Sequence, residues 1–279
     1  LYYLSGLDRA GRLSARRFFG QHDWYGEGAE YLVARQATLA GSWKGSGHME
    51  DEIVSTSFAL LFLSKGLAPV LVNKLKFGPR DNRGLITDAD WDNHHSDVNN
   101  LTKHISSLDR WPKLLTWQQV DSQSATVGDL HQAPVVFISG RYGYDFTEQE
   151  RGKLKEYVSG GGTIFVESCC DGVDFDRSFR EMIRQMYPDG EAELVRLGQD
   201  HEIYRSEYPL DAETVELWGV DLGCRTAIIY SPEDLSCLWD KWRQRPPENR
   251  SDNLAAMVLR AMKVGVNVIA YATGRELME

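Results

Sequence analysis

A cysteine with the neighbours of a catalytic nucleophile lies near the middle of the chain. The segment Ser168-Cys169-Cys170-Asp171-Gly172 separates a predicted strand from a predicted helix over 174–187, and it places small residues two positions on either side of Cys170. This spacing is typical of a nucleophile elbow, in which the following helix lowers the pKa of the thiol. The backbone N–H of Asp171 would then provide half of an oxyanion hole. The pattern predicts Cys170 as a nucleophile.

A thiol nucleophile needs a general base, and His201 is the candidate. Asp200 and Glu202 flank it, and either carboxylate could orient the imidazole, because a Cys–His–acid set is recognised by geometry and not by chain order. The catalytic hypothesis uses Cys170, His201 and Asp200. The alternative is structural: cysteine after a strand is often a small buried apolar residue, and an Asp-His-x-Ile segment often fixes a loop by hydrogen bonds. The sequence also lacks the His-x-Glu pair of glutaminases.

Three predicted loops follow strands of a parallel sheet, at 77–95, 139–146 and 167–174. In an open parallel sheet, ligands bind beyond the carboxyl ends of the strands, near the point where the strand order reverses. We therefore expect the ligand-binding side chains in these loops. The candidates are Asp90, Trp91, His94, Arg141, Tyr142, Glu167 and Asp171.

The first of these loops is rich in acidic residues and histidine. It contains Asp88, Asp90, Asp92, His94, His95 and Asp97. Alternating carboxylates can coordinate a hard cation, but the glycine and the bidentate glutamate of an EF-hand are missing. Adjacent histidines also do not share a helix face as an i, i+4 pair would. We expect a solvated loop that caps the next helix, no metal site and no cofactor.

The composition is that of an acidic globular protein. Among 279 residues, 31 are Lys or Arg and 41 are Asp or Glu, which gives a net charge of −10. A nucleic-acid binder needs a basic surface to displace counterions, so this class is excluded. The longest uncharged apolar run, Ile53 to Ser64, is shorter than the ~20 residues of a membrane span, so we expect a soluble chain without one. Zinc-type spacing is absent, and we expect free thiols, at Cys169, Cys170, Cys224 and Cys237.

Two parts of the chain differ in pattern. Residues 1–66 have apolar stripes at helical spacing, with Asp23 as a candidate N-cap and Gly66 as a helix terminator. After Pro69, short runs rich in Val, Ile and Phe alternate with amphipathic segments. The strands are expected at 70–75, 114–120, 135–138 and 163–167, and the helices at 96–108, 126–132, 147–159 and 174–187. This alternation predicts an α/β fold: a parallel sheet with helices on both faces.

The pattern loosens after Asp189. Short strands are expected at 193–197, 202–205, 215–218 and 225–230, followed by a helix through 235–242. A last helix begins near Asp252. Periodicity leaves open whether 266–271 continue this helix past Gly265 or form a strand.

Residues 68–279 resemble a bacterial family, domain of unknown function 4159. The matching stretches keep their order along the chain and are 70–77, 90–92, 135–140, 154–158, 161–162, 175–180, 200–203 and 224–231. Arg141 stands where relatives are expected to carry a His, and Glu167-Ser168-Cys169 stands where they are expected to carry an acidic pair. The resemblance implies a flavodoxin-like, class I glutamine-amidotransferase-like α/β fold, with its function open.

Residues 23–66 resemble a terminal repeat of the prenyltransferase/squalene-oxidase family. The resemblance rests on Gln36, the turn Gly41-Ser42-Trp43-Lys44-Gly45 and the acidic-led helix 52–66. It implies the last segment of an α/α toroid, on whose upstream part this segment would pack. The chain begins with Leu1, and we expect an absent N-terminal part, which could carry an export signal. The compartment is otherwise unknown.

Three functions are consistent with these patterns. The first is a non-catalytic binding module of glutamine-amidotransferase-like fold, whose partner is an unidentified small molecule or protein. The second is a Cys-dependent hydrolase or amidotransferase-like enzyme that uses Cys170 and His201. The third is the C-terminal part of a terpene-cyclase-like toroid protein. We favour the binding module. The fold does not decide among the three, because function depends on the site and not on the fold.

Overall fold

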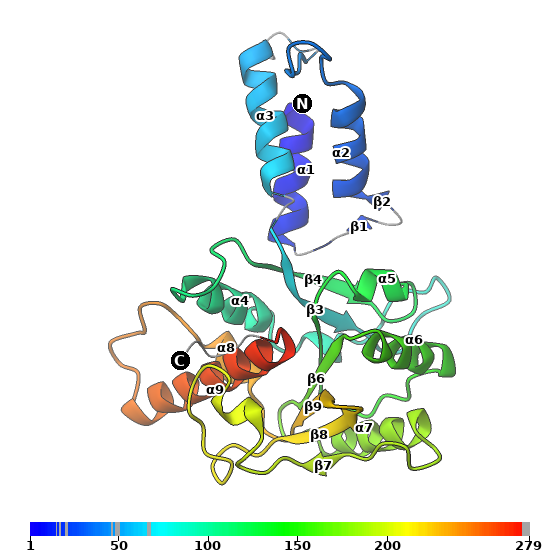
Figure 1. The fold of residues 1–279 in the computed structure, drawn as a ribbon, viewed down its shortest axis with the longest axis vertical. Coiled ribbons are helices and arrows are strands. Elements are labelled where there is room, and N and C mark those ends of the chain that lie inside the picture. Colours follow the sequence, from blue (N-terminus) through cyan, green and yellow to red (C-terminus); the bar gives the residue numbers. More distant parts are fainter. Residues whose placement is uncertain are drawn as a thin grey trace. The chain divides into compact units, whose positions relative to one another are not determined.

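The computed structural model describes residues 1–274 except 15, 17, 20, 21, 46, 48–50, 66 and 67. The chain divides into two compact units, Leu1–Pro69 and Val70–Glu279 (Figure 1). Gly66, the predicted helix terminator, and the boundary predicted at residues 66 and 67 lie outside the described residues. Each unit is considered below by itself.

The first unit consists mainly of helices. They are α1 (Tyr2–Leu13), α2 (Trp24–Ala34) and α3 (Glu52–Lys65), and a short antiparallel pair, β1 (Phe18–Phe19) and β2 (His22–Asp23), precedes α2. Asp23 caps α2 as predicted, because its carboxylate accepts the N–H groups of Tyr25 and Gly26. A small apolar core forms around Trp24, Leu32, Trp43, Ala59 and Phe62.

The second unit is built on a seven-stranded, mostly parallel sheet. Its strands are β3 (Val70–Lys76), β4 (Thr116–Asp121), β5 (Val135–Gly140), β6 (Thr163–Ser168), β7 (Val195–Arg196), β8 (Trp218–Leu222) and β9 (Arg225–Ser231). The spatial order is β4-β3-β5-β6-β9-β8-β7. The first five strands in this order run parallel to one another, and β8 pairs antiparallel with β9. Numbered along the chain, these five follow the flavodoxin-like order 2-1-3-4-5, whose reversal lies between β3 and β5.

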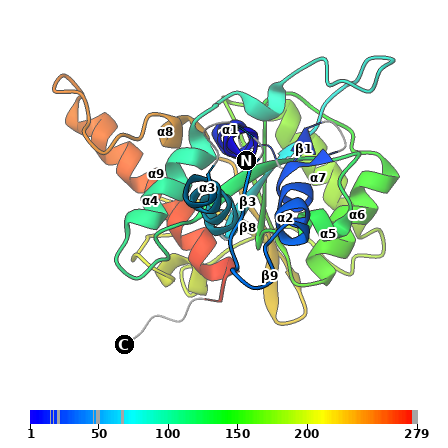
Figure 2. The same ribbon diagram turned by 90° about the horizontal axis from the view of Figure 1, so that it is seen from above.

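Helices cover both faces of this sheet (Figures 1 and 2). They are α4 (Asp97–Ser107), α5 (Val127–Leu130), α6 (Glu148–Ser159), α7 (Val173–Met186), α8 (Ser236–Asp240) and α9 (Asp252–Ala272). On β5, Val135 and Phe137 belong to the core under α4, α8 and α9, whereas Val136 and Ile138 belong to the core under α5, α6 and α7. Successive strand residues point to opposite faces, which explains why buried strands are apolar throughout. The α/β prediction is confirmed.

Helix ends follow the predicted signals. Thr147 and Glu150 form a capping box at the start of α6. At its other end, Gly160 is the C-cap and Gly161 has φ +103°, a conformation that favours glycine. The glycine run 160–162 therefore ends the helix that was expected over 147–159.

The last helix is continuous, which settles the question left open at Gly265. A Cβ at Gly265 would come within 2.8 Å of Leu101 and of Trp239, so this glycine permits the close approach of α9 to α4 and α8. By length and hydropathy alone, α9 is the one helix among the described residues that would be able to cross a membrane. Its residues 264–270 are nevertheless all buried within the α/β unit, which makes it a core helix.

Two predicted strands differ from the structure. Residues 202–205 form a 3₁₀ helix, η2 (Glu202–Arg205), and 215–217 precede β8 as irregular chain. Ile203 and Tyr204 are buried, so apolar residues adopt this turn without belonging to the sheet. A second 3₁₀ helix, η1 (Asp90–Asp92), follows β3.

Candidate functional site

The site lies in loops at the carboxyl edge of the parallel strands. Asp90 enters the space between β3 and β5, where its Oδ2 accepts the N–H groups of Arg141 (2.8 Å) and Tyr142 (2.9 Å). Asn93 Nδ2 donates to Asp90 Oδ1 at 2.9 Å. Asp90 thus ties the loop after β3 to the loop after β5, at the reversal of strand order where ligands bind in such folds.

The other residues predicted at this edge differ in exposure. Trp91 is buried, with the ammonium groups of Lys74 and Lys76 within 6 Å of its ring centre. Arg141, Tyr142 and Asp171 are exposed, and the Arg141 guanidinium lies 5.5 Å from the Tyr142 ring centre. Arg141, Tyr142 and Asp171 lie at the rim of the carboxyl edge. They are not part of the group of close side-chain contacts described next.

A tight turn brings two thiols together after β6. Cys169 is fully buried, and its N–H donates to Gly140 O at 2.9 Å. Cys170 and Asp171 have φ values of +53° and +57°, a left-handed conformation that costs non-glycine residues about 1–2 kcal/mol each. The two thiols approach to 3.1 Å. All four cysteines of the chain are free, as predicted.

Four donor atoms from three loops converge beside this turn. His94 Nε2 lies 3.4 Å from Cys169 Sγ, 3.5 Å from Cys170 Sγ and 3.7 Å from Asp234 Oδ1. We call His94, Cys169, Cys170 and Asp234 the donor cluster; all four donor atoms lie within 4.8 Å of one another. His94 follows η1, the thiols follow β6, and Asp234 follows β9. Side chains up to 140 positions apart thus meet at one edge of the sheet.

A buried lysine holds the first of these loops. Lys74 is 1% exposed, and its ammonium group donates to Asp92 (2.6 Å), to Asp97 (2.8 Å) and to the backbone oxygen of His94 (2.9 Å). Burial lowers the pKa of Lys74, but Asp97 and Asp92 outweigh it and hold the pKa above its ordinary value. Burial raises the pKa of Asp97 to about 6, against the opposing effect of Lys74. Lys74 therefore stays charged and fixes the backbone at His94.

This arrangement corrects the prediction of a solvated acidic loop. Asp97 is 1% exposed and Asp90 8% exposed, because the buried cation of Lys74 and the amides after β5 supply partners for their carboxylates. The segment does lead into α4, with Ser96 at the N-cap position, but Ser96 makes no side-chain cap hydrogen bond.

Glu167 holds the loop that carries Asp234. It is fully buried; its Oε2 accepts the N–H groups of Leu235 and Ser236, both at 2.9 Å, and Ser139 donates to its Oε1. Burial raises the pKa of Glu167 to about 7. Asp234 itself accepts the N–H of Cys170 (2.9 Å) and of Cys237 (3.0 Å). The third loop is thereby fixed against β6.

The pKa shifts in the donor cluster are the opposite of those that activate a thiol, because an activated thiol has a lowered pKa. Burial raises the pKa values of Cys169 and Cys170. The hydrogen bond to Asp234 raises the pKa of His94 in spite of burial. Burial would raise the pKa of Asp234, but His94 and the amides of Cys237 and Cys170 lower it below its usual value. These shifts favour the charged imidazole beside a charged carboxylate, and they favour the neutral form of both thiols.

The predicted Cys170–His201 pair is not formed. His201 Nε2 hydrogen-bonds Thr226 Oγ1 at 2.9 Å, and its Nδ1 accepts the N–H of Ile203 as the N-cap of η2. Thr226 lies five residues before the carboxyl end of β9, about 16 Å along the strand. Asp200 is exposed. The alternative of a loop fixed by hydrogen bonds therefore describes this segment.

The capping role of His201 predicts a pH-dependent stability. Burial lowers the pKa of His201, so the unfolded chain binds the proton more readily, and the free energy of unfolding should fall as pH drops through about 6.5. His201→Asn keeps a capping acceptor but cannot be protonated; we expect it to be about 1 kcal/mol less stable at pH 7, because it loses the hydrogen bond to Thr226 Oγ1. Urea unfolding at pH 7 and pH 5 should show this difference shrinking at pH 5. A difference that grows at pH 5 would contradict the assignment.

Three important residues have weak signals in the sequence. Cys169 lies beside Cys170, but no pattern in the sequence indicated a role for it. Asp234 follows the turn Ser231-Pro232, and Lys74 lies within an apolar strand. A lysine between Asn73 and Leu75 in a strand buried on both faces is the one signal that would have identified a buried ion pair. Asp234 has no such signal, because only the pairing of β9 with β6 brings it to the thiols.

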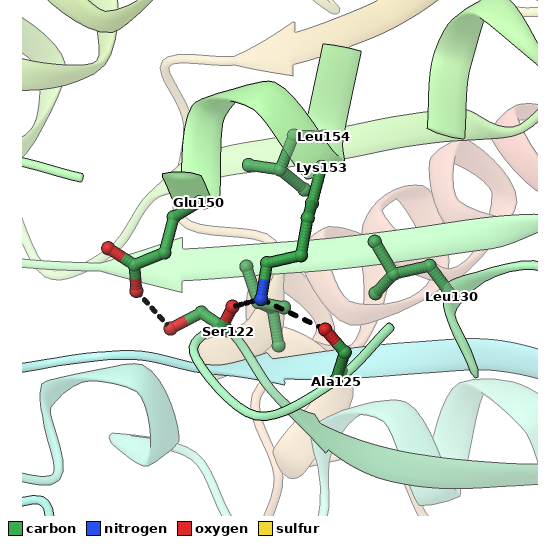
Figure 3. Close-up of a pocket in the computed structure, with 7 residues that line it drawn as sticks. Ser122, Ala125, Leu130, Glu150, Lys153 and Leu154 are labelled. Carbon is green, nitrogen blue, oxygen red and sulfur yellow. Dashed lines mark hydrogen bonds between the residues drawn. The ribbon is translucent and has the colours of Figure 1, made fainter. Parts of the chain in front are cut away.

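A small hollow elsewhere in this unit has a structural role. It lies near the start of α6 and is lined by Leu75, Ser122, Ala125, Leu130, Glu150, Lys153 and Leu154 (Figure 3). Lys153 Nζ donates to the backbone oxygens of Ser122 and Ala125, and Ser122 Oγ donates to Glu150. Because Lys153 and Glu150 on α6 bond the backbone and the Ser122 hydroxyl of the loop after β4, this hollow joins that loop to α6.

Comparison with known proteins identifies the family of the α/β unit. Residues 74–273 match the family described as domain of unknown function (DUF4159), and the match includes the donor cluster, Lys74 and Glu167. The comparison with curated proteins finds no match. Because the family match covers more than two thirds of the sequence, the chain belongs to the DUF4159 family.

Proposed function

We propose that the α/β unit is a ligand-binding module and that the donor cluster is its binding site. In this proposal Cys170 contacts the ligand and does not attack a substrate. The site is reachable, since the side chains of His94 and Asp234 are 15% and 24% exposed. It is also held in shape from three sides, by Lys74, by Glu167 and by the left-handed turn at Cys170.

One observation carries the proposal: both thiols and the carboxylate face the same nitrogen of His94. In a Cys–His–Asp relay, one ring nitrogen takes the proton of the thiol and the carboxylate orients the ring through the other nitrogen. Here Asp234 Oδ1 and both Sγ atoms lie within 3.7 Å of Nε2. This arrangement suits joint contact with a ligand at the centre better than proton transfer.

Thiol reactivity tests the proposal within one protein. In reduced protein freed of metal by a chelator, iodoacetamide should label Cys170 no faster than Cys224, which is exposed and serves as the internal control. The reason is that Asp234 and the thiols share Nε2 of His94, so no carboxylate orients this imidazole through its other nitrogen as in an activated pair. Peptide mass spectrometry measures both rates. Labelling of Cys170 ten or more times faster than Cys224 would overturn the binding module.

That outcome would favour a second candidate, a Cys-dependent hydrolase in which His94 replaces His201. The observation in its favour is the left-handed Cys170 between β6 and α7, 3.5 Å from the His94 imidazole. Strained residues cluster at functional sites, and this turn has the position of a nucleophile elbow.

The finer resemblances are also part of the proposal. The order 2-1-3-4-5 of the parallel strands supports a flavodoxin-like relative of the class I glutamine amidotransferases. For residues 1–66, a toroid-type repeat is supported by two contacts: Trp43 Nε1 donates to Leu32 O at 2.7 Å, and Gln36 Nε2 donates to Gly41 O at 2.8 Å. Both link the end of α2 to the turn before α3.

A further inference from the structure

We infer that His94, Cys169, Cys170 and Asp234 form a four-coordinate site for a divalent transition-metal ion of the zinc class. This inference rests on the proposed function, because it names the ligand of the same site. It also departs from the sequence, where neither cysteine spacing nor the acidic loop indicated a metal.

The separations between His94 Nε2 and the other three donor atoms fit a tetrahedral ion. With metal–sulfur distances of about 2.3 Å and metal–nitrogen or metal–oxygen distances of about 2.0–2.2 Å, neighbouring ligand atoms are about 3.3–3.8 Å apart. The distances from His94 Nε2 to the two Sγ atoms and to Asp234 Oδ1 are 3.4, 3.5 and 3.7 Å. The Sγ–Sγ distance of 3.1 Å would open by about 0.7 Å, through a rotation of the less buried Cys170 side chain.

The donor types select the class of metal. Thiolates are soft ligands, and a set of two sulfurs with imidazole favours zinc over calcium or magnesium, which prefer oxygen ligands. Two thiolates, one carboxylate and a neutral imidazole carry three negative charges, so a divalent ion leaves a net charge of −1. Binding breaks two S–H bonds and, where the imidazole of His94 is protonated, its Nε2–H bond as well, and these protons pass to solvent.

In this site, the left-handed backbone at Cys170 and Asp171 places both thiols where they can bind one ion. Adjacent residues of an extended chain point to opposite sides, so Cys169 and Cys170 would not normally reach one ion. The left-handed conformation of Cys170 and Asp171 reverses the chain after β6 and brings both thiols to the same side of the turn. Two consecutive non-glycine residues with positive φ are therefore explained by the need for two sulfur ligands.

Outer contacts orient each ligand, as in known metal sites. Lys74 holds the backbone of His94, and Glu167 holds the amides of Leu235 and Ser236 next to Asp234. The N–H of Cys170 donates to Asp234 Oδ2, and Oδ1, which faces the imidazole, accepts the N–H of Cys237. The ligands are thus held in place by groups that are themselves buried.

Cobalt titration of the full chain tests the site. Chelator-treated, reduced protein should bind one Co²⁺ per chain, with sulfur-to-cobalt charge-transfer absorption and the intense visible bands of tetrahedral Co²⁺. Added Zn²⁺ should abolish both. Cys169→Ser, Cys170→Ser, His94→Gln and Asp234→Asn should each weaken Co²⁺ binding by more than the roughly 10–100-fold that loss of an outer partner costs. Cys224→Ser, the matched control, should bind as the wild type does.

The outcomes separate this inference from the proposed function. Absence of the charge-transfer band at saturating Co²⁺, or its survival in a Cys169→Ser/Cys170→Ser variant with a native circular-dichroism spectrum, overturns the metal site. If Cys170 is at the same time slow to react with iodoacetamide, the binding module stands with a different ligand. If Cys170 of the metal-free protein reacts ten or more times faster than Cys224, the binding module itself fails.

Discussion

Replacing Lys74 by methionine is expected to lower the free energy of unfolding of the α/β unit by about 3–5 kcal/mol, because it leaves the buried carboxylate of Asp97 without its cation. Asp97 and Lys74 are each 1% exposed, so water cannot take over the lost contacts. Typical domains are stable by about 5–15 kcal/mol, and a loss of this size would be easily measured by urea unfolding.

Two further variants separate the ion pair from side-chain loss. Lys74→Met/Asp97→Asn removes both charges, and we expect it to recover part of the stability, since an unpaired buried charge is the main cost. Lys103→Met, on the exposed side of α4, should change stability by less than about 0.5 kcal/mol. The ion-pair explanation is wrong if Lys74→Met loses under 1 kcal/mol or if the double variant is no more stable than the single one.

Glu167→Leu is expected to destabilise the unit by about 2–4 kcal/mol, because it strands two buried amide donors, each at about 1–3 kcal/mol. Leucine is similar in size to glutamate but cannot accept the N–H groups of Leu235 and Ser236, which now bond Oε2. Freed of this contact, the loop after β9 should also hold Asp234 less well, so Co²⁺ binding should weaken.

Glu167→Gln is the matched control for this prediction. Its amide oxygen can accept both backbone N–H groups, and its NH₂ can donate to Ser139 Oγ, so it should lose less than about 1 kcal/mol. Thermal or urea unfolding measures the difference. Equal losses in the two variants would show that the charge of Glu167, and not its role as acceptor, determines stability.

The sequence predicts the sheet well because its strands are buried on both faces. Runs such as Val135-Val136-Phe137-Ile138 have one interpretation, and β3, β4, β5 and β6 lie at or near their predicted positions. The segment 202–205 was predicted wrongly as a strand, because the apolar Ile203 and Tyr204 fill the core from a 3₁₀ turn. Burial alone did not distinguish the two conformations.

The site was harder to predict than the fold. His94 and Glu167 were expected at the carboxyl edge, since each follows a predicted strand. The partner of the thiols was placed at His201, because a sequence does not show at which end of a sheet a histidine in a long connection will lie. Asp234 became visible only through the pairing of β6 with β9, whereas Lys74 had one signal in the sequence, its position within a buried strand.

The pairing of β6 with β9 has a consequence for the folding pathway. Residues 169–224 separate these two parallel strands, so their pairing must close a long loop, whereas β8 and β9 meet across the short turn at Gly223. Closure of long loops is entropically costly and makes non-local parallel pairing slow. Docking of the β8–β9 hairpin on β6 is therefore a late event, and it brings Asp234 to Cys170.

Before this docking is complete, the thiols of Cys169 and Cys170 lack the Asp234 carboxylate that lies beside them in the folded protein. An ion that requires all four side chains binds only the finished fold, and it slows unfolding by holding the β9 loop to the β6 turn. The donor cluster thus links β6 and β9 at their carboxyl ends, where an ion bound as inferred above would hold the completed sheet together.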